Sequence, residues 1–441
     1  MLTDHVDRAA PGDTGALTIG GEMTEARAAR ERLDVLNALG LAFIESGHPT
    51  GETARVLRGC AAGLGVPGAG ITMLGKTIVL EHTADDGVVE HRAGSATAID
   101  VVDCARLRAL TRIARSVADG ELAGAEACAA IDRTRAASTP WWWSSAGLAA
   151  LAFFIALQVG VGWLPALLAA GVNLVVSVVG HLAGRAGTPR LFTVTAQALT
   201  GGVLAVLLET LEVVGPLGAA AAVAVSWLLL VPLPQLVRAV TDLIDSEYLA
   251  ALTRFANSAM TLSGIAIGAV LTIALGDHTG FERPADVTLP ALALPLILLF
   301  SAFGAVSNAF ANGGRFGLVL PAAVVGLGTA AVNQLLLRAA GTEPLWASTA
   351  SAVVLGVAAM VSASRLGYPP QVLALMGITG ALLPGLTVFH GVVLELAGGS
   401  GAAFFTDAAW ICVGLGVGVT FGFFAGFYRT GPNRTIRPTA S

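Results

Sequence analysis

Ten apolar stretches run from residue 143 almost to the end of the chain, and they constrain its fold more than any other feature. Each is near the ~17 to 25 residues that a helix needs to cross ~30 Å of hydrocarbon. The breaks at 160–163 and 210–214 are short, so nine or eleven spans also fit. Such a chain is expected to fold as an α-helical polytopic membrane protein. The stretches are 143–160, 163–183, 191–210, 214–234, 255–276, 288–308, 316–337, 345–363, 371–394 and 404–427.

Charged residues are concentrated before the first stretch. Residues 1–141 hold 14 of the 25 Lys and Arg residues and 19 of the 30 Asp and Glu residues, although charged residues make up only 12% of the chain. The formal net charge of −5 therefore falls in this polar head, and no basic run exists that would neutralise several phosphates, which argues against nucleic acid as a partner. Residues 1–23 are acidic and Gly-rich without the apolar core of a signal peptide, and we expect a disordered tail there.

Helical and strand patterns predict a small cytosolic α+β domain over residues 24–140. Apolar residues spaced by three or four indicate a first helix between 24 and 46, and a second is expected from about 50 to 63 or 65. Three β-rich runs follow at 70–74, 76–83 and 88–91, which suits a small antiparallel sheet. Asp103 can cap a third helix that ends at Gly120, and residues 121–137 restart the helical pattern.

The arginines between the apolar stretches predict the orientation. With the head in the cytoplasm, nine arginines fall on the inside and two, Arg283 and Arg338, on the outside. Inner loops of membrane proteins carry such an excess of basic residues. We therefore expect a multi-pass membrane protein with both termini in the cytoplasm. The nine inside residues are Arg185, Arg190, Arg238, Arg254, Arg315, Arg365, Arg429, Arg434 and Arg437.

A proline motif occurs twice, 152 residues apart. Leu-Val-Pro at 230–232 aligns with Leu-Leu-Pro at 382–384, and each copy sits in the fourth stretch of a group of five. Because five is odd, two such groups cross the membrane in opposite senses, as in the inverted repeats of many secondary transporters. We expect a first five-helix repeat at 141–276, a second at 277–430 and a cytosolic tail at 431–441. Alternating access is the default mechanism of such a body.

Several short motifs follow one another in a recognisable order. The head contains Ala-Leu-Gly at 38–40, Glu-Ser-Gly-His-Pro-Thr at 45–50 and Ala-Ala-Gly-Leu-Gly-Val at 61–66, and further matching segments at 99–107, 119–122 and 126–127. In the body, Val-Pro at 231–232 precedes Arg238, Asp242 and Arg254, and Leu-Pro-Gly recurs at 383–385. Over about residues 24–430, these motifs resemble the threonine/serine exporter family of bacterial inner-membrane proteins.

The resemblance implies a cytosolic N-terminal domain, about ten transmembrane helices and export of threonine, serine or similar small solutes, driven by the proton gradient. The implied partners are a small amino-acid substrate, protons and the lipid bilayer, and a homo-oligomer is left open. The chain departs from the family pattern at two points. Its first proline motif reads Pro-Leu-Pro at 232–234 without the expected glycine, and His48 stands where a small residue is commoner.

The two proline motifs supply the candidate substrate and coupling residues. Pro232 and Pro234 remove two backbone donors, which leaves carbonyls for neighbouring helices, water or a substrate ammonium; a purely structural kink is the alternative. Arg238 and Asp242 are four residues apart and so share one helix face. They form either a solvated surface pair or a transport site. In the second case Arg238 receives the substrate carboxylate and Asp242 carries a proton. The candidates are Pro232, Pro234, Gln235, Arg238, Asp242, Arg254, Pro384, Gly385, Thr387, His390 and Glu395.

Other polar residues in or near the spans have weaker cases. His390 aligns with Arg238 and titrates in a useful range, but a histidine bound to a neighbouring helix fits equally well. Glu209, Glu212 and Asp407 suit the membrane interface. Neutral residues suit interhelical hydrogen bonds, with one or two left open as lining of a path; these are Asn173, Gln197, Asn257, Asn308, Asn312, Asn333 and Gln334.

The sequence carries no pattern typical of an enzyme. It has no nucleotide loop, no nucleophile with a base at a matching spacing, and four cysteines without a CxxC pair, so we expect no cofactor, metal or disulfide. A non-enzymatic exporter is the first interpretation. The alternative is a channel-like or sensory membrane protein whose cytosolic head binds a ligand or a partner.

Overall fold

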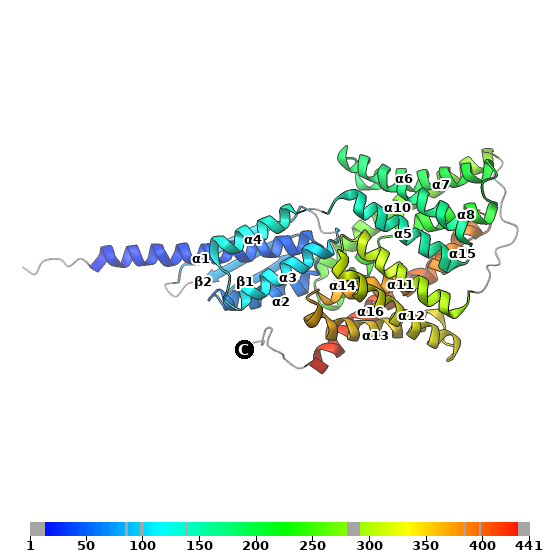
Figure 1. Cartoon of the computed structure of the whole chain (residues 1–441). Coiled ribbons are helices and arrows are strands. Elements are labelled where there is room, and N and C mark those ends of the chain that lie inside the picture. Colours follow the sequence, from blue (N-terminus) through cyan, green and yellow to red (C-terminus); the bar gives the residue numbers. More distant parts are fainter. Residues whose placement is uncertain are drawn as a thin grey trace, which may run out of the picture.

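A computed structural model of the chain describes residues 14–83, 87–97, 101–137, 139–279, 292–382, 385–396 and 398–430. It has a head that projects from one end of a helical body (Figure 1). The head consists of helices and a three-stranded antiparallel sheet in the order β1-β2-β3, in which Met73 pairs with Ile78. Its elements are α1 (Thr14–Glu45), α2 (Thr50–Gly63), β1 (Gly70–Leu74), β2 (Thr77–Thr83), β3 (Val89–Ser95), α3 (Cys104–Ala118) and α4 (Gly124–Ala136).

The predicted α+β head is confirmed, with one correction at its start. Asp103 caps α3 as expected, since its Oδ1 accepts a hydrogen bond from the Arg106 N–H at 2.9 Å. Helix α1, however, begins at Thr14, so residues 14–23 are helical and not the expected tail; residues 1–13 lie outside the described part. Adding a residue to an existing helix gains one hydrogen bond, and two glycines at 20–21 cost only about 1 kcal/mol each, so the helix continues through them.

The body is a bundle of apolar helices. Its first group comprises α5 (Trp141–Val159), α6 (Trp163–Arg185), α7 (Arg190–Thr210), α8 (Pro216–Leu230), α9 (Leu233–Ile244) and α10 (Tyr248–Thr279). The second comprises α11 (Leu294–Ala311), a 3₁₀ turn (Phe316–Leu318), α12 (Val319–Arg338), α13 (Pro344–Leu366), α14 (Pro370–Gly377), a π-helical turn (Ile378–Leu382), α15 (Gly385–Leu396) and α16 (Ala402–Thr430).

The count of membrane spans agrees with the sequence. Among the described residues, nine helices are long and apolar enough to cross a membrane, with α8 and α9 counted together. A bent pair, Pro370–Leu382 with Thr387–Glu395 at 52°, makes a tenth span if the two parts are one. The polytopic helical fold is thus confirmed, while the division into two inverted repeats, the segment boundaries and the sidedness stay predictions.

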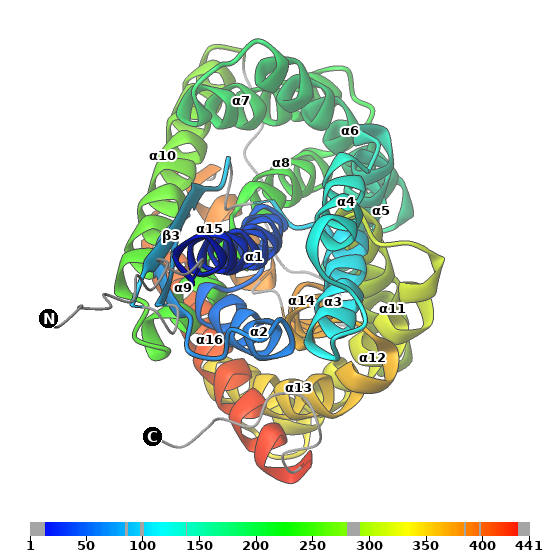
Figure 2. The same cartoon turned by 90° about the vertical axis from the view of Figure 1, so that its left-hand side faces the viewer.

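Helix α8 lies at the centre of the body. In its span 67% of the most apolar window is buried, against 28–39% in most others, which expose their apolar faces as helices in contact with lipid do. Seen from the head end (Figure 2), α5, α6, α7, α10, α11, α12 and α13 surround α8 and α15. Helices α8 and α15 pack on each other, and a Cβ on Gly385 would lie 3.2 Å from Leu228 Cδ2.

Glycines spaced by four residues, at 264 and 268 of α10 and at 414, 418, 422 and 426 of α16, bring two helix pairs into close contact. A Cβ on Gly418 of α16 would lie 2.5 Å from the carbonyl oxygen of Thr349 on α13. On α10, a Cβ on Gly268 would lie 2.6 Å from Ala198 Cβ of α7. Small residues let backbones approach in this way in membranes, where packing rather than water exclusion holds helices together. These glycines therefore have a packing role.

Candidate functional site

The first proline motif breaks the central span where expected. Helix α8 ends at Leu230, Pro232 is the N-cap residue of α9, and Pro234 lies in its first turn. Because proline has no N–H, Pro234 cannot donate to the carbonyl of Leu230 one turn earlier. The Gln235 N–H instead bonds to the Pro232 carbonyl at 3.0 Å and restarts the helix. The break therefore removes the helical hydrogen bond that the Leu230 carbonyl would otherwise accept.

The second break is a π-helical turn followed by residues 383–384, so Pro384 lies outside the described residues. Side chains of neighbouring helices bind carbonyls near this break. Gln158 of α5 donates to the Gly380 carbonyl at 3.2 Å, and Asn308 of α11 donates to the Leu375 carbonyl at 3.2 Å. Asn308 thus makes the interhelical bond expected of it, whereas the role of Gln158 was missed. Neighbouring helices therefore satisfy these two carbonyls, as expected of a purely structural kink.

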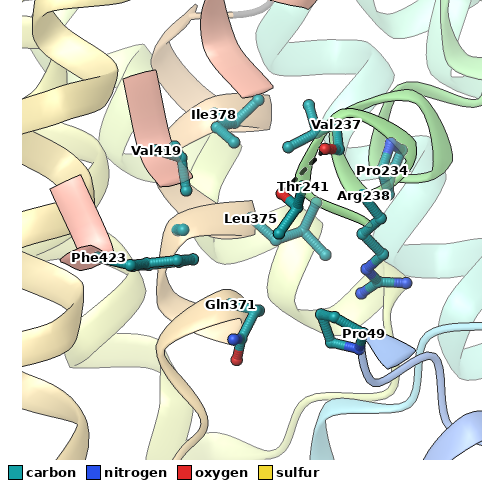
Figure 3. A pocket seen from close by; sticks show the side chains of 11 residues that line it. Pro49, Pro234, Val237, Arg238, Thr241, Gln371, Leu375, Ile378, Val419 and Phe423 are labelled. Atoms are coloured by element: carbon teal, nitrogen blue, oxygen red, sulfur yellow. Dashed lines mark hydrogen bonds between the residues drawn. The ribbon is translucent and has the colours of Figure 1, made fainter. Parts of the chain in front are cut away.

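One cavity lies between the two broken spans (Figure 3). It measures about 30 Å³, room for a water molecule or two and too small for an amino acid in this conformation. Helix α9 contributes Arg238 and Thr241, α14 contributes Gln371, and α16 contributes Phe423. The head contributes Pro49. Its full lining is Pro49, Pro234, Val237, Arg238, Thr241, Gln371, Ala374, Leu375, Ile378, Val419 and Phe423.

Hydrogen bonds hold the polar lining of α9 in place. Thr241 Oγ1 donates to the Val237 carbonyl at 3.1 Å, shown dashed in Figure 3, and is 3.0 Å from Thr420 Oγ1 of α16. Arg238 and Gln371 lie on either side of Pro49 in the same view. Gln371 is 9% exposed, and neither of its amide atoms has a hydrogen-bond partner among the described residues. The cavity is therefore mostly apolar with a cation at one side and an amide at the other.

Arg238 and Asp242 are buried, which contradicts the interpretation as a solvated surface pair. Arg238 is 6% exposed and Asp242 is fully buried. Asp242 bonds to a different arginine: its Oδ2 accepts from Arg254 Nε of α10 at 2.8 Å, and its Oδ1 accepts from the Thr50 N–H of the head at 3.3 Å. Arg238 instead extends along the cavity wall toward Pro49 (Figure 3). Arg238 therefore faces the cavity, whereas Asp242 holds α9 to α10.

The candidates of the second motif lie elsewhere. Thr387, His390 and Glu395 are on α15, and none of them lines the cavity. The His390 ring stacks on Phe404 with 5.8 Å between ring centres, and Glu395 Oε1 accepts from the Gly401 N–H at 2.8 Å. The residues that meet α9 at the cavity precede the second break instead of following it. Gln371 was therefore missed, although the two prolines before it mark the start of that span.

The head supplies a cluster of ionisable residues next to the cavity. His48 Nε2 is 3.9 Å from Glu52 Oε2, and His48 Nδ1 is 2.9 Å from Thr53 Oγ1. Burial lowers the pKa of His48 to about 3, assisted by the positive charge of Arg238. Burial raises the pKa of Glu52 to about 7, with Arg55 opposing and Asp245 and Asp242 assisting the rise. Both groups thus favour the neutral form while the head is seated on the body.

The spans and the cavity between two broken helices define a polytopic helical membrane protein with a small, mostly apolar internal cavity that Arg238, Thr241 and Gln371 border. Residues 34–276 match the family described as "Putative threonine/serine exporter". The chain belongs to this threonine/serine exporter family. It is similar to a protein of Mycobacterium tuberculosis named "Probable threonine/serine exporter", with 25% identity over 418 residues that cover 92% of this chain and 78% of the relative. No solved structure matches the chain.

Proposed function

We propose that the protein is a secondary active transporter that exports threonine, serine and similar small amino acids across the cytoplasmic membrane in exchange for protons. The observation that carries the proposal is the meeting of both broken spans at one cavity beside Arg238. Family membership supports amino-acid export. Transporters of this general design bind substrate near discontinuous helices, where backbone groups and helix ends face the ligand.

In the proposed site, Arg238 binds the substrate carboxylate. Its guanidinium can make two parallel hydrogen bonds with a carboxylate, which fixes the orientation of the amino acid. In this proposal the substrate ammonium would bind a backbone carbonyl that the prolines leave without a helical donor. Gln371, buried and without a partner among the described residues, would face the far end of the substrate. The cavity has to enlarge to admit an amino acid, so binding is coupled to a movement of the helices.

The packing of the broken spans supports two inverted repeats and alternating access. Helix α9, which follows the first break, and α14, which precedes the second, flank the same cavity. On the other side of the breaks, α8 and α15 pack together. Two segments related by inversion would place their parts in this crossed way. In the proposed cycle the two groups rock about this crossing, with the head and both termini in the cytoplasm.

Reconstituted vesicles test the proposal. Purified protein in liposomes should move labelled threonine against its gradient when a pH difference is imposed, and collapse of that difference should stop the movement. Passive flux, or no flux, would favour the channel-like or sensory alternative, which the seating of the head on the body also suits.

Arg238→Lys is the variant that tests the site. Lysine keeps the charge but cannot form the two-bond contact, so threonine uptake at low concentration should fall at least ~10-fold. Arg185→Lys, at the exposed end of α6, is the matched control and should transport like the wild type. Equal rates for both variants would remove Arg238 from the site.

A further inference from the structure

Residues 46–52 of the head, which comprise the turn after α1 and the first residues of α2, form one wall of the cavity. This segment is called the turn below. Pro49 lines the cavity directly. Gly47 has φ +79°, and a Cβ there would lie 2.7 Å from Arg238 Nη1. Only glycine combines this backbone conformation with so close an approach to the arginine. The turn is therefore shaped to fit against the cation of the proposed site.

Polar contacts hold this turn to α9. The Thr50 N–H donates to Asp242 Oδ1 at 3.3 Å, and Arg55 Nη2 of α2 lies 3.5 Å from Asp245 Oδ2 at the end of α9. Arg55 is 52% exposed, and exposed ion pairs of this length contribute little to stability. One buried hydrogen bond and one exposed ion pair thus join this segment to α9, and the ion pair is the weaker of the two.

A second set of contacts ties the head to the other group of helices. The Cys104 N–H of α3 donates to the Asn312 carbonyl after α11 at 2.8 Å. Arg108 donates to Tyr368 Oη at 3.2 Å, and its guanidinium carbon lies 4.5 Å from the centre of that ring. The head therefore contacts α9 of the first group and the α11–α12 and α13–α14 connections of the second group at the same time.

We propose that the head is the gate of the transport cavity on its own side of the membrane. In the docked state the turn at 46–52 closes the cavity and clamps the two groups of helices together; in each cycle the turn leaves α9 while α3 stays attached to the second group. This inference rests on the proposed transport function. It assigns the head a role in transport itself, because a body that rocks cannot move while both sets of contacts persist.

A disulfide across the contact tests the gate. A Cβ on Gly51 would lie 3.3 Å from Asp245 Cβ, close to the ~3.5–4.5 Å between the Cβ atoms of a disulfide. In Gly51→Cys/Asp245→Cys protein, with Cys128→Ser to remove a partly exposed thiol, oxidation should reduce threonine transport at least ~10-fold and a reductant should restore it.

The matched control is a disulfide inside the head. Gly70 and Glu81 pair across β1 and β2, and a Cβ on Gly70 would lie 3.6 Å from Glu81 Cβ. Oxidised Gly70→Cys/Glu81→Cys protein should transport like its reduced form. Full transport by the oxidised Gly51→Cys/Asp245→Cys protein would overturn the gate and leave the exporter standing. Absence of coupled transport in the unmodified protein would overturn the proposed function.

Replacement of Asp245 could itself impair transport, so a second test introduces only the cysteine at position 51 and keeps Asp245. The thiol of Gly51→Cys should react with a water-soluble maleimide at least ~3-fold faster during threonine turnover under a pH gradient than at rest, because the turn then leaves α9. The same labelling rate in both conditions would show that the turn stays docked, and would contradict the gate.

Discussion

At the scale of single residues, Asp242 and Arg254 form a buried ion pair within the body. Both side chains are buried, at 0% and 2% exposure, and their atoms are 2.8 Å apart. Removing one member of a buried pair leaves a charge without compensation, which costs about 3–5 kcal/mol. We expect Asp242→Asn and Arg254→Gln each to lower the melting temperature of the purified protein strongly, and the double variant to recover most of the loss.

The exposed pair in α1 is the control for this cycle. Arg27 and Glu31 are 3.4 Å apart, with side chains 82% and 58% exposed. Arg27→Gln should cost less than about 1 kcal/mol. Additive losses in the Asp242→Asn/Arg254→Gln protein would mean that the two charges do not depend on each other. The expectation also limits the use of Asp242→Asn as a probe of proton coupling, since the variant is destabilised before transport is measured.

At the scale of elements, the close contact between α13 and α16 depends on glycine. We expect Gly418→Ala to destabilise the protein by about 1–3 kcal/mol, because its Cβ would lie 2.5 Å from the Thr349 carbonyl and 2.9 Å from Ala352 Cβ. Gly328→Ala on α12, where no atom lies within 4 Å of the added Cβ among the described residues, is the control. Thermal unfolding in detergent compares the two variants. Equal melting temperatures would show that α13 and α16 can move apart without a loss of stability.

The elements were largely predictable, but their pairing across the breaks was not. An apolar run of ~17 to 25 residues has the length of a helix that crosses a membrane, so the lengths of the runs predict the spans. Alignment of the two proline motifs placed His390 opposite Arg238 along the chain. In space Arg238 faces the cavity with Gln371, which precedes the second break, whereas His390 follows that break and is not among the lining residues. The partner of Asp242 was hidden in the same way, since α10 brings Arg254 to it by tertiary packing.

At the scale of the whole molecule, the head and the body share one core. A continuous cluster of buried apolar side chains joins Leu33 and Phe43 of the head to Leu233 of α9 and Leu373 of α14. A change of composition at residue 140 predicts where the head ends, yet it carries no information on how the head sits. That docking arises from contacts between residues hundreds of positions apart, which no local pattern records.

Docking of the head should depend on Glu52. Burial raises the pKa of Glu52 from its ordinary value of 4.5 to about 7 in the docked head, and we expect undocking to expose this carboxyl. The Glu52 contribution to docking is then complete below pH 4.5 and is lost as pH rises to 7. His48, with its pKa lowered to about 3, acts in the opposite sense below pH 6.5. Glu52→Gln removes the first effect alone. It should therefore strengthen docking at pH 8 by up to about 3 kcal/mol and leave it unchanged near pH 4.5.

Hydrogen exchange of the turn at 46–52 measures this effect, with variant and wild type compared at the same pH. Slower exchange in the Glu52→Gln protein at pH 8, and equal exchange at pH 4.5, is the expected result. Glu121→Gln, an exposed carboxyl of the head, serves as control and should match the wild type at both values. A Glu52→Gln difference of the same size at both values would mean that Glu52 does not titrate on docking.

The bond between Arg108 and Tyr368 also sets an order for biosynthesis. The two residues are 260 positions apart, so at ~5–20 residues per second the ribosome adds Tyr368 roughly 13 to 52 s after Arg108. Throughout that interval the newly made head lacks the surface that covers its apolar side chains. We therefore expect the head to complete its packing only after the second group of helices has been synthesised.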